Sequence, residues 1–246
     1  MQEFFAPDWQ DYRMDYRDPF RDLEPLAQEA AVVQEALDAL AAAGILPSAA
    51  YDQQLFLRHR QAVREAFEIP WTAISPRVER LIYAINAIAR PRTIAAAGIF
   101  CGFTFICNAG AAVGPGKCYE AEDVVGIEIK PDEADRARRN VLRLDPTGAA
   151  RVVAADAVEY LARYDRPVGL LYLDADGDRG RGKSIYLEIL QATYDKMPAG
   201  ALVLAHNSVN AAHQLEDFFA FVGDPANMTA AMNVVLDPEG LLVARK

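Results

Sequence analysis

The sequence has few cysteines and no sign of an export signal, and both absences exclude classes of protein. Only three of its 246 residues are cysteine, Cys101, Cys107 and Cys118, an odd number that does not suit a disulfide-stapled secreted domain. No basic segment followed by an apolar signal segment opens the chain, so we expect a reducing, cytoplasmic location. Cys101 and Cys107 lack the spacing of a zinc site, and we expect buried or half-buried thiols.

The sequence also lacks an excess of basic residues and any long apolar run. Its net charge is -10 and its isoelectric point is about 4.8. Such a surface opposes phosphate binding, so we expect no nucleic-acid partner. No apolar stretch approaches the roughly 20 residues of a membrane span, and we expect no membrane partner. With 52% hydrophobic residues, the chain can form one globular domain with an appendage, and small molecules or proteins are the expected partners.

Residues 1–90 carry helical patterns and are expected to form an N-terminal helical cap or dimerisation region. An alanine-rich segment that stops at Gly44 predicts one helix, and further helices are expected over 50–68 and 76–90. A homodimer through this region remains open.

Aromatic residues recur in the first twenty positions, three or four apart. They are Trp9, Tyr12, Tyr16 and Phe20. The spacing predicts an aromatic stripe on a short acidic helix that packs on the protein's own core. The alternative is a lid that closes on a ligand, with Trp71 or Tyr51 also lining the acceptor site.

From residue 92 the chain alternates between strand and helix patterns. Strands are predicted over 92–98, 123–129, 150–156, 168–176 and 200–207, and helices over 103–114, 132–144, 157–164 and 184–196. This alternation predicts an α/β fold over 91–246, a Rossmann-like doubly wound, mostly parallel sheet with helices on both faces. Two apolar runs within 233–246, joined by a turn at Gly240, predict a C-terminal antiparallel hairpin on the sheet edge.

The strand ends indicate where a ligand would bind, because such sheets bind ligands beyond the carboxyl ends of their strands. Gly98 and Gly102 bracket the first turn from strand to helix, where glycine permits close approach of a ligand. Glu128 ends the second strand and can accept hydrogen bonds from both hydroxyls of a ribose, and Asp156 ends the third and can accept from an exocyclic amine. Together they predict a nucleoside site. A nicotinamide dehydrogenase is disfavoured because the turn reads "GIFCGF" rather than GxGxxG.

On these motifs, residues 92–246 resemble class I S-adenosylmethionine-dependent methyltransferases, and more narrowly the small-molecule O-methyltransferases of the catechol and caffeoyl-CoA type. The segments that carry the resemblance are "AAAGIFCGFT", "VVGIEIKPDEADRARRNV", "VVAADAVEYL", "LLYLDAD" and "PAGALVLAHN". The resemblance implies S-adenosylmethionine as the cofactor. The implied cofactor-binding residues are Gly98, Gly102, Glu128, Asp156 and Asp174. One departure is Ala96, which stands where the family often has an acidic residue, so recognition of the cofactor's amino group is expected to differ.

The metal-dependent members of that family have an Asp at the end of the fourth strand, an Asp-Asn pair at the fifth, and a Lys that acts as base shortly after the first Asp. Here Asp174 and Asn207 match, but His206 replaces the second Asp and Gly177 stands at the lysine position. Mg²⁺ prefers oxygen ligands, so an imidazole weakens such a site, and a divalent metal held by Asp174, His206 and Asn207 is the less favoured interpretation. We prefer His206 as an organic acid or base, with Asp174 beside it. A structural histidine is a further alternative.

The segment "LDADGDRGRGKSIY", residues 173–186, carries both signs of charge between glycines. Arg179, Arg181 and Lys183 are predicted to clamp an anionic substrate, since such cations bind carboxylate or phosphate. Asn207 and Tyr186 would complete the acceptor site. The alternative is an exposed loop whose charges pair with one another.

The resulting prediction is a transferase, an S-adenosylmethionine-dependent methyltransferase that O-methylates a small, anionic metabolite. One alternative keeps the cofactor and transfers or cyclises its aminocarboxypropyl group, which would release methylthioadenosine. A second alternative is a non-catalytic binding protein on the same fold.

Overall fold

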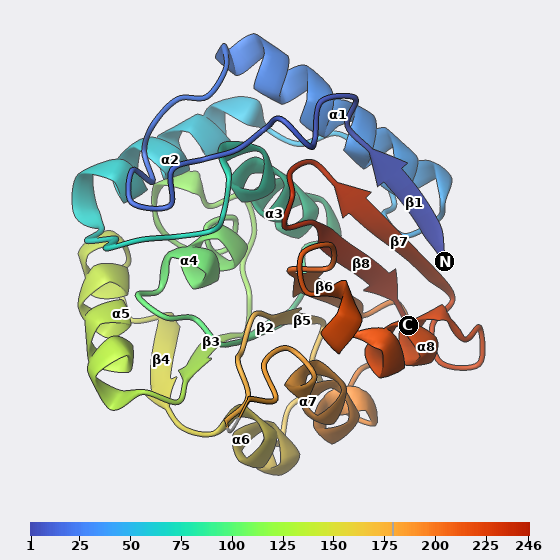
Figure 1. The fold of residues 1–246 in the computed structure, drawn as a ribbon. Helices are drawn as coiled ribbons and strands as arrows, with labels where there is room; N and C mark the ends of the chain where they lie inside the picture. Colours follow the sequence, from blue (N-terminus) through green and yellow to red (C-terminus); the bar gives the residue numbers. More distant parts are fainter. Residues whose placement is uncertain (179) are drawn as a thin grey trace.

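Eight strands form one mixed sheet that is covered by helices on both faces (Figure 1). The structure, a computed structural model, describes residues 1–178 and 180–246. The strands are β1 (Gln2–Phe5), β2 (Thr93–Ala97), β3 (Asp123–Glu128), β4 (Ala150–Ala154), β5 (Leu170–Leu173), β6 (Leu202–His206), β7 (Ala230–Val235) and β8 (Leu241–Arg245). The α-helices are α1 (Leu26–Ala42), α2 (Gln53–Ala66), α3 (Pro76–Ala89), α4 (Phe103–Ala109), α5 (Pro131–Leu144), α6 (Ala157–Arg163), α7 (Ile185–Tyr194) and α8 (Glu216–Gly223).

The strand order is β1-β7-β8-β6-β5-β2-β3-β4, and only β8 runs antiparallel to its neighbours, β6 and β7. The expected mostly parallel, Rossmann-like sheet with an antiparallel C-terminal pair is therefore confirmed. The hairpin does not lie on the sheet edge as expected, because β1 pairs with β7 in parallel and forms the edge itself.

Two apolar layers enclose this sheet, one on each face. Successive side chains of a strand point to opposite faces. Ile94 and Ala96 of β2 accordingly pack in the layer that holds the N-terminal helices, α4 and α5, while Ala95 and Ala97 pack in the layer beneath α6, α7 and α8. Burial on both faces explains why the central strands read as continuous apolar runs.

The first twenty residues do not form the expected acidic helix. After β1 the chain runs through turns, and its aromatic side chains serve different contacts. The guanidinium carbon of Arg77 lies 3.7 Å from the ring centroid of Tyr12, and the hydroxyl of Tyr16 donates to the carboxylate of Glu239. Residue spacing could not reveal the strand, because β1 finds its partner more than 220 residues along the chain.

Buried ion pairs join the three N-terminal helices. Arg60 of α2 donates to Glu29 of α1 at 2.9 Å and to Glu79 of α3 at 2.8 Å. Arg80 of α3 pairs with the other oxygen of Glu29 at 2.5 Å. Buried charges are tolerated when they are paired in this way. The network fixes the ends of the connection between α2 and α3, whose residues 71–74 reach the cavity described below.

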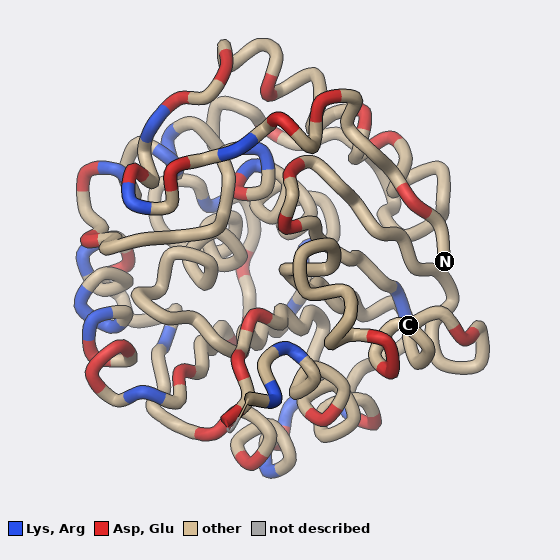
Figure 2. Tube along the Cα trace, in the orientation of Figure 1, with Lys and Arg blue, Asp and Glu red and all other residues tan. Residues whose placement is uncertain are grey.

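Charges of both signs are interleaved along the chain, including on the outer face of α5 (Figure 2). There Arg136 and Arg138 pair with acidic residues one turn earlier on the same helix. Within the described ranges, none of the helices combines the length and apolar character needed to cross a membrane.

Candidate active site

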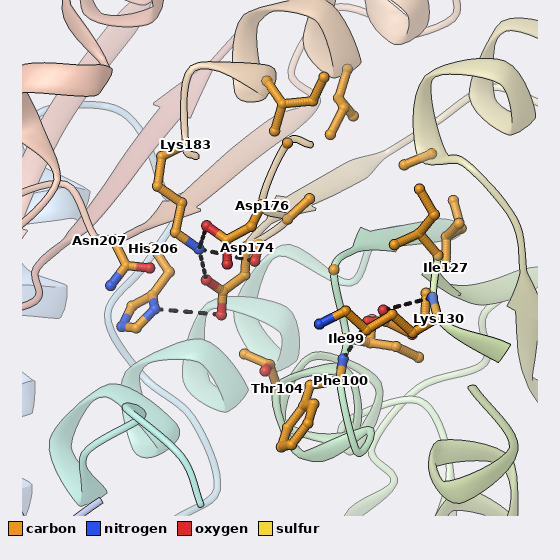
Figure 3. Close-up of a pocket in the computed structure, with 18 of the residues that line it drawn as sticks. Ile99, Phe100, Thr104, Ile127, Lys130, Asp174, Asp176, Lys183, His206 and Asn207 are labelled. Carbon is orange, nitrogen blue, oxygen red and sulfur yellow. Dashed lines mark hydrogen bonds and ion pairs between the residues drawn. The ribbon is translucent and has the colours of Figure 1, made fainter. Parts of the chain in front are cut away.

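A cavity of about 460 Å³ lies where the strands β2, β3, β4, β5 and β6 end. Its volume falls within the roughly 300–1,000 Å³ of small-molecule sites. The predicted site residues that line it are Gly98, Glu128, Asp156, Asp174, Arg181, Lys183, His206 and Asn207. The structure thus brings together residues from five strand ends and from the loop after β5. Figure 3 shows Asp174, Lys183, His206 and Asn207 on one side of the cavity and Phe100 and Lys130 on the other.

Glu128 presents a carboxylate in a fixed orientation at the end of β3. Its Oε2 accepts a hydrogen bond from the N–H of Phe100 at 2.8 Å, and its Oε1 accepts from the N–H of Lys130 at 3.0 Å. A carboxylate has about four lone-pair sites, so both oxygens can accept a further bond. Glu128 can therefore receive two neighbouring hydroxyls without moving.

Asp156 and Gly98 also line the cavity, and each has a structural task as well. Asp156 caps α6, since its Oδ1 accepts from the N–H of Glu159 at 3.0 Å. Gly98 has φ +78°, and a Cβ there would lie 2.3 Å from Cα of Ala175. The turn after β2 therefore requires glycine because the end of β5 passes directly beside it.

Gly102 does not lie where the sequence interpretation placed it. It is the residue before α4, with φ +90°, and a Cβ there would meet Cβ of Ala137 on α5 at 3.1 Å. It is outside the cavity lining. Its glycine serves helix packing, and direct contact with a ligand is not supported.

Asp174 and His206 form a polar pair in the cavity wall, in which His206 is buried and Asp174 is half-buried. Nδ1 of His206 lies 3.4 Å from Oδ2 of Asp174, and among the described residues neither ring nitrogen makes a hydrogen bond. Burial alone would lower the pKa of His206, but the charge of Asp174 outweighs it and the pKa is raised. Burial would raise the pKa of Asp174, but the charges of Lys183 and His206 hold it below its ordinary value. Nε2 of His206 is buried and has no hydrogen-bond partner among the described residues.

Two of the three cations of the predicted clamp, Lys183 and Arg181, pair with carboxylates of this chain. Lys183 turns inward and donates to Oδ1 of Asp174 at 2.9 Å, while Arg181 pairs with Glu188 at 2.8 Å. Arg179 lies outside the described residues. Burial would lower the pKa of Lys183, but the charges of Asp174 and Asp176 raise it. The alternative interpretation, in which charges of this segment pair with nearby charges, matches Lys183 and Arg181 better.

Tyr186 is fully buried and does not reach the cavity. Its hydroxyl donates to the backbone oxygen of His206 at 3.2 Å, so Tyr186 supports the site from behind and does not contact an acceptor. Tyr51 is also outside the lining and accepts from Arg80 at 3.1 Å.

Trp71 and Thr104 are cavity residues whose roles the sequence did not settle. Trp71 comes from the α2–α3 connection, and its ring centroid lies 4.9 Å from that of Phe100. Thr104, on α4, faces the cavity as Figure 3 shows. Trp71 lines the cavity, as the alternative with Trp71 or Tyr51 at the acceptor site expected, whereas nothing in the sequence pattern distinguished Thr104 from a packing residue.

Several solved structures share this architecture. The protein is similar to cofactor-bound Rv0187 from MTB, with a TM-score of 0.60, 20% identity, and coverage of 79% of this chain and 90% of that one. It is similar to the O-methyltransferase from Bacillus cereus in complex with SAH, with a TM-score of 0.60, 18% identity and coverage of 88% and 97%. It is also similar to SAH-bound methyltransferase PaMTH1 of Podospora anserina, with a TM-score of 0.61, 14% identity and coverage of 92% and 98%. No protein-family model matches the sequence, and the search of curated proteins found no match.

The fold is that of the O-methyltransferases. The resemblance seen in residues 92–246 is confirmed at this level, and it extends to the N-terminal helices, since the aligned regions cover up to 92% of the chain.

Within this methyltransferase fold, Ala96 is fully buried in the middle of β2 and cannot contact a ligand. The acidic residues beside the turn after β2 are Glu128 and Asp174, which stand at the ends of the two neighbouring strands, β3 and β5. The backbone of Asp174 lies against Gly98, where a Cβ would be 2.6 Å from the Asp174 carbonyl carbon.

Proposed function

We propose that the protein is an S-adenosylmethionine-dependent methyltransferase that acts on a hydroxyl group of a small molecule. The observation that carries this proposal is one cavity that joins the fixed carboxylate of Glu128 to the buried pair of Asp174 and His206. Solved structures with this fold that hold a bound cofactor or SAH support it.

The Glu128 side of the cavity suits the nucleoside part of the cofactor. Glu128 would accept both ribose hydroxyls, and Asp156 would accept from the adenine amine. Asp174 lies beside the Gly98 turn, but its two oxygens already face Lys183 and His206, so we do not assign it to the cofactor's amino group. S-adenosylmethionine would supply a methyl group on a sulfonium, which is already a good leaving group.

The His206 side suits deprotonation of the acceptor. Nε2 of His206 would accept the hydroxyl proton, while Asp174 keeps Nδ1 facing its own carboxylate and so orients the ring. Positioning supplies much of the rate in such a reaction, because the acceptor oxygen must approach the methyl carbon in line. Trp71 and Phe100 provide an aromatic wall that would hold the acceptor and exclude water.

Lys183 and Arg181, the two described cations of the predicted clamp, give no support to an anionic acceptor. Lys183 and Arg181 both have carboxylate partners already. The aromatic wall favours a small molecule with an apolar or aromatic body.

Calorimetric titration with S-adenosylhomocysteine tests the cofactor half directly. Glu128→Ala should weaken binding roughly 100-fold, because hydrogen bonds to a charged group contribute about 1.5–3 kcal/mol each. Glu120→Ala is the matched control, since Glu120 is exposed and precedes the amino end of β3, whereas Glu128 stands at its carboxyl end. Equal affinity of the Glu128→Ala variant and the wild type would remove the nucleoside assignment.

A further inference from the structure

Lys183 holds its ammonium inside the cavity, next to the residues that resemble a metal site. Nζ donates to Oδ1 of Asp174 at 2.9 Å and to the backbone oxygen of Asp174 at 3.1 Å. It lies 3.5 Å from Oδ1 of Asp176. The Lys183 side chain is only 11% exposed, so this is an interior cation and not a surface charge. Figure 3 shows all three contacts converging on Nζ.

The loop after β5 fixes the position of this amine. The N–H of Gly177 donates to the backbone oxygen of Gly182 at 2.8 Å, which brings the loop back toward the strand end. The N–H of Lys183 then donates to Oε1 of Gln214 at 2.7 Å. Lys183 therefore reaches Asp174 although it lies nine positions further along the chain, while Gly177 offers no side chain at the position of the family's lysine.

The residues that would hold a divalent metal do not fit one. Asp174 already gives Oδ1 to an ammonium, and its Oδ2 faces an imidazole. His206 stands where a second carboxylate would complete the oxygen ligands that Mg²⁺ prefers. A divalent cation at this position would also lie against the positive charge of Lys183. Across residues 1–178 and 180–246, no group of three or more His, Cys, Asp or Glu side chains is arranged to hold a metal.

We propose that the ammonium of Lys183 takes the place of a divalent cation beside Asp174, and that the site binds and activates its acceptor through Lys183 and His206 without a metal. This inference rests on the proposed methyltransferase function. Two of the three N–H donors of Lys183 are held by Asp174. The third points near Asp176, whose side chain is largely exposed and can be displaced by an acceptor oxygen.

The proposed methyl transfer needs only groups on this chain and the two proposed substrates. The acceptor oxygen forms a bond to the methyl carbon, and the carbon–sulfur bond breaks with its electron pair remaining on sulfur, which becomes a neutral thioether. The hydroxyl proton goes to Nε2 of His206. The negative charge that develops on the acceptor oxygen lies beside Lys183, where a fixed ammonium in a partly dry site stabilises it.

Metal binding is the first readout, because it does not need the acceptor. Chelator-treated protein is titrated with Mn²⁺ and followed by electron paramagnetic resonance, and the same preparation is titrated with S-adenosylhomocysteine. We expect no saturable Mn²⁺ binding that depends on Asp174, together with normal S-adenosylhomocysteine binding. Saturable Mn²⁺ binding that Asp174→Asn abolishes would overturn this inference while leaving the proposed function intact. Absence of S-adenosylhomocysteine binding would overturn the proposed function, and the role of Lys183 toward an acceptor with it.

Turnover is the second readout, with a metal-depleted metabolite extract as the source of acceptor. Lys183→Met should lower formation of S-adenosylhomocysteine about 100-fold, within the range of one electrostatic donor, without loss of cofactor affinity. Lys183→Arg should keep part of the activity, and Lys117→Met, at an exposed lysine, should keep all of it. Restoration of Lys183→Met by Mg²⁺ or Mn²⁺, or stimulation of the wild type by either ion, would contradict the proposal.

Discussion

Nδ1 of His206 and Oδ2 of Asp174 lie 3.4 Å apart at the adjacent ends of β6 and β5. The carboxylate faces Nδ1, and Nε2 is buried without a hydrogen-bond partner among the described residues. That arrangement orients an imidazole for proton transfer, and it depends on two neighbouring parallel strands ending at the same level.

Replacement of His206 should remove catalysis and leave cofactor binding. We expect His206→Gln to lower the rate of methyl transfer about 100-fold or more, because general-base catalysis contributes roughly 10²–10⁴. S-adenosylhomocysteine affinity by calorimetry should stay close to that of the wild type. His213→Gln, at an exposed histidine, is the control. A His206→Gln variant with full turnover would show that the acceptor needs no base from this residue.

Replacement of Gly98 should destabilise the protein by a clash, beyond the effect of its backbone angle. Gly98→Ala places a Cβ 2.3 Å from Cα of Ala175, whereas Gly148→Ala, at φ +72°, meets nothing within 4 Å. Urea unfolding should show a loss of about 1 kcal/mol for Gly148→Ala and clearly more for Gly98→Ala, since only the second adds overpacking. Equal losses for the two variants would mean that the strands separate easily at this point.

Trp71 should report ligand binding through its fluorescence. It lines the cavity beside Phe100, while Trp9 packs near Phe5 outside the lining. In Trp9→Phe the emission of Trp71 should change as S-adenosylhomocysteine is added. In Trp71→Phe the remaining signal from Trp9 should stay constant, and a change there instead would place the ligand elsewhere.

His59 should make stability fall in mild acid. Its ring is fully buried between Gly110 and Gly116, and neither of its nitrogens has a hydrogen-bond partner among the described residues. Burial, with the charge of Arg60, lowers the pKa of His59 to about 3. Below pH 6.5 His59 is therefore protonated in the unfolded chain but stays neutral in the folded protein. The stability that is present at neutral pH is lost as the pH falls toward 3.

The expected loss from His59 is about 2 kcal/mol between pH 7 and pH 5, from 1.36 kcal/mol per pH unit below the unfolded pKa. Urea unfolding of the wild type and of His59→Gln at both pH values measures it. The variant should lose about that much less than the wild type over this interval. Parallel pH dependences of the two proteins would show that His59 is protonated in the folded state.

The sequence was informative about strand ends and much less so about the loops between them. Glu128, Asp156, Asp174 and His206 each follow an apolar run, and parallel strands bring such positions to one edge of the sheet. The amino-acid pattern alone was therefore enough to place these residues together.

The parts that could not be predicted depend on contacts between distant segments. β1 pairs with β7 across most of the chain, and the four-residue strand carries no alternation strong enough to indicate it. In the sequence, Lys183 is one of three equivalent cations. Its inward direction depends on the hydrogen bond to Gln214 and on the Gly177–Gly182 contact, and the sequence shows neither. Gly102 and Tyr186 matched their motif, but packing against Ala137 and the backbone of His206 decides their positions.

Mass spectrometry of the products tests the central claim most directly. The purified protein is incubated with S-adenosylmethionine, with and without a metabolite extract, and S-adenosylhomocysteine and methylthioadenosine are quantified against Glu128→Ala. The methyltransferase assignment predicts S-adenosylhomocysteine that requires the extract and is lost in the variant. Methylthioadenosine in its place would mean that the aminocarboxypropyl group is transferred, and neither product would mean that this fold serves here as a binding protein.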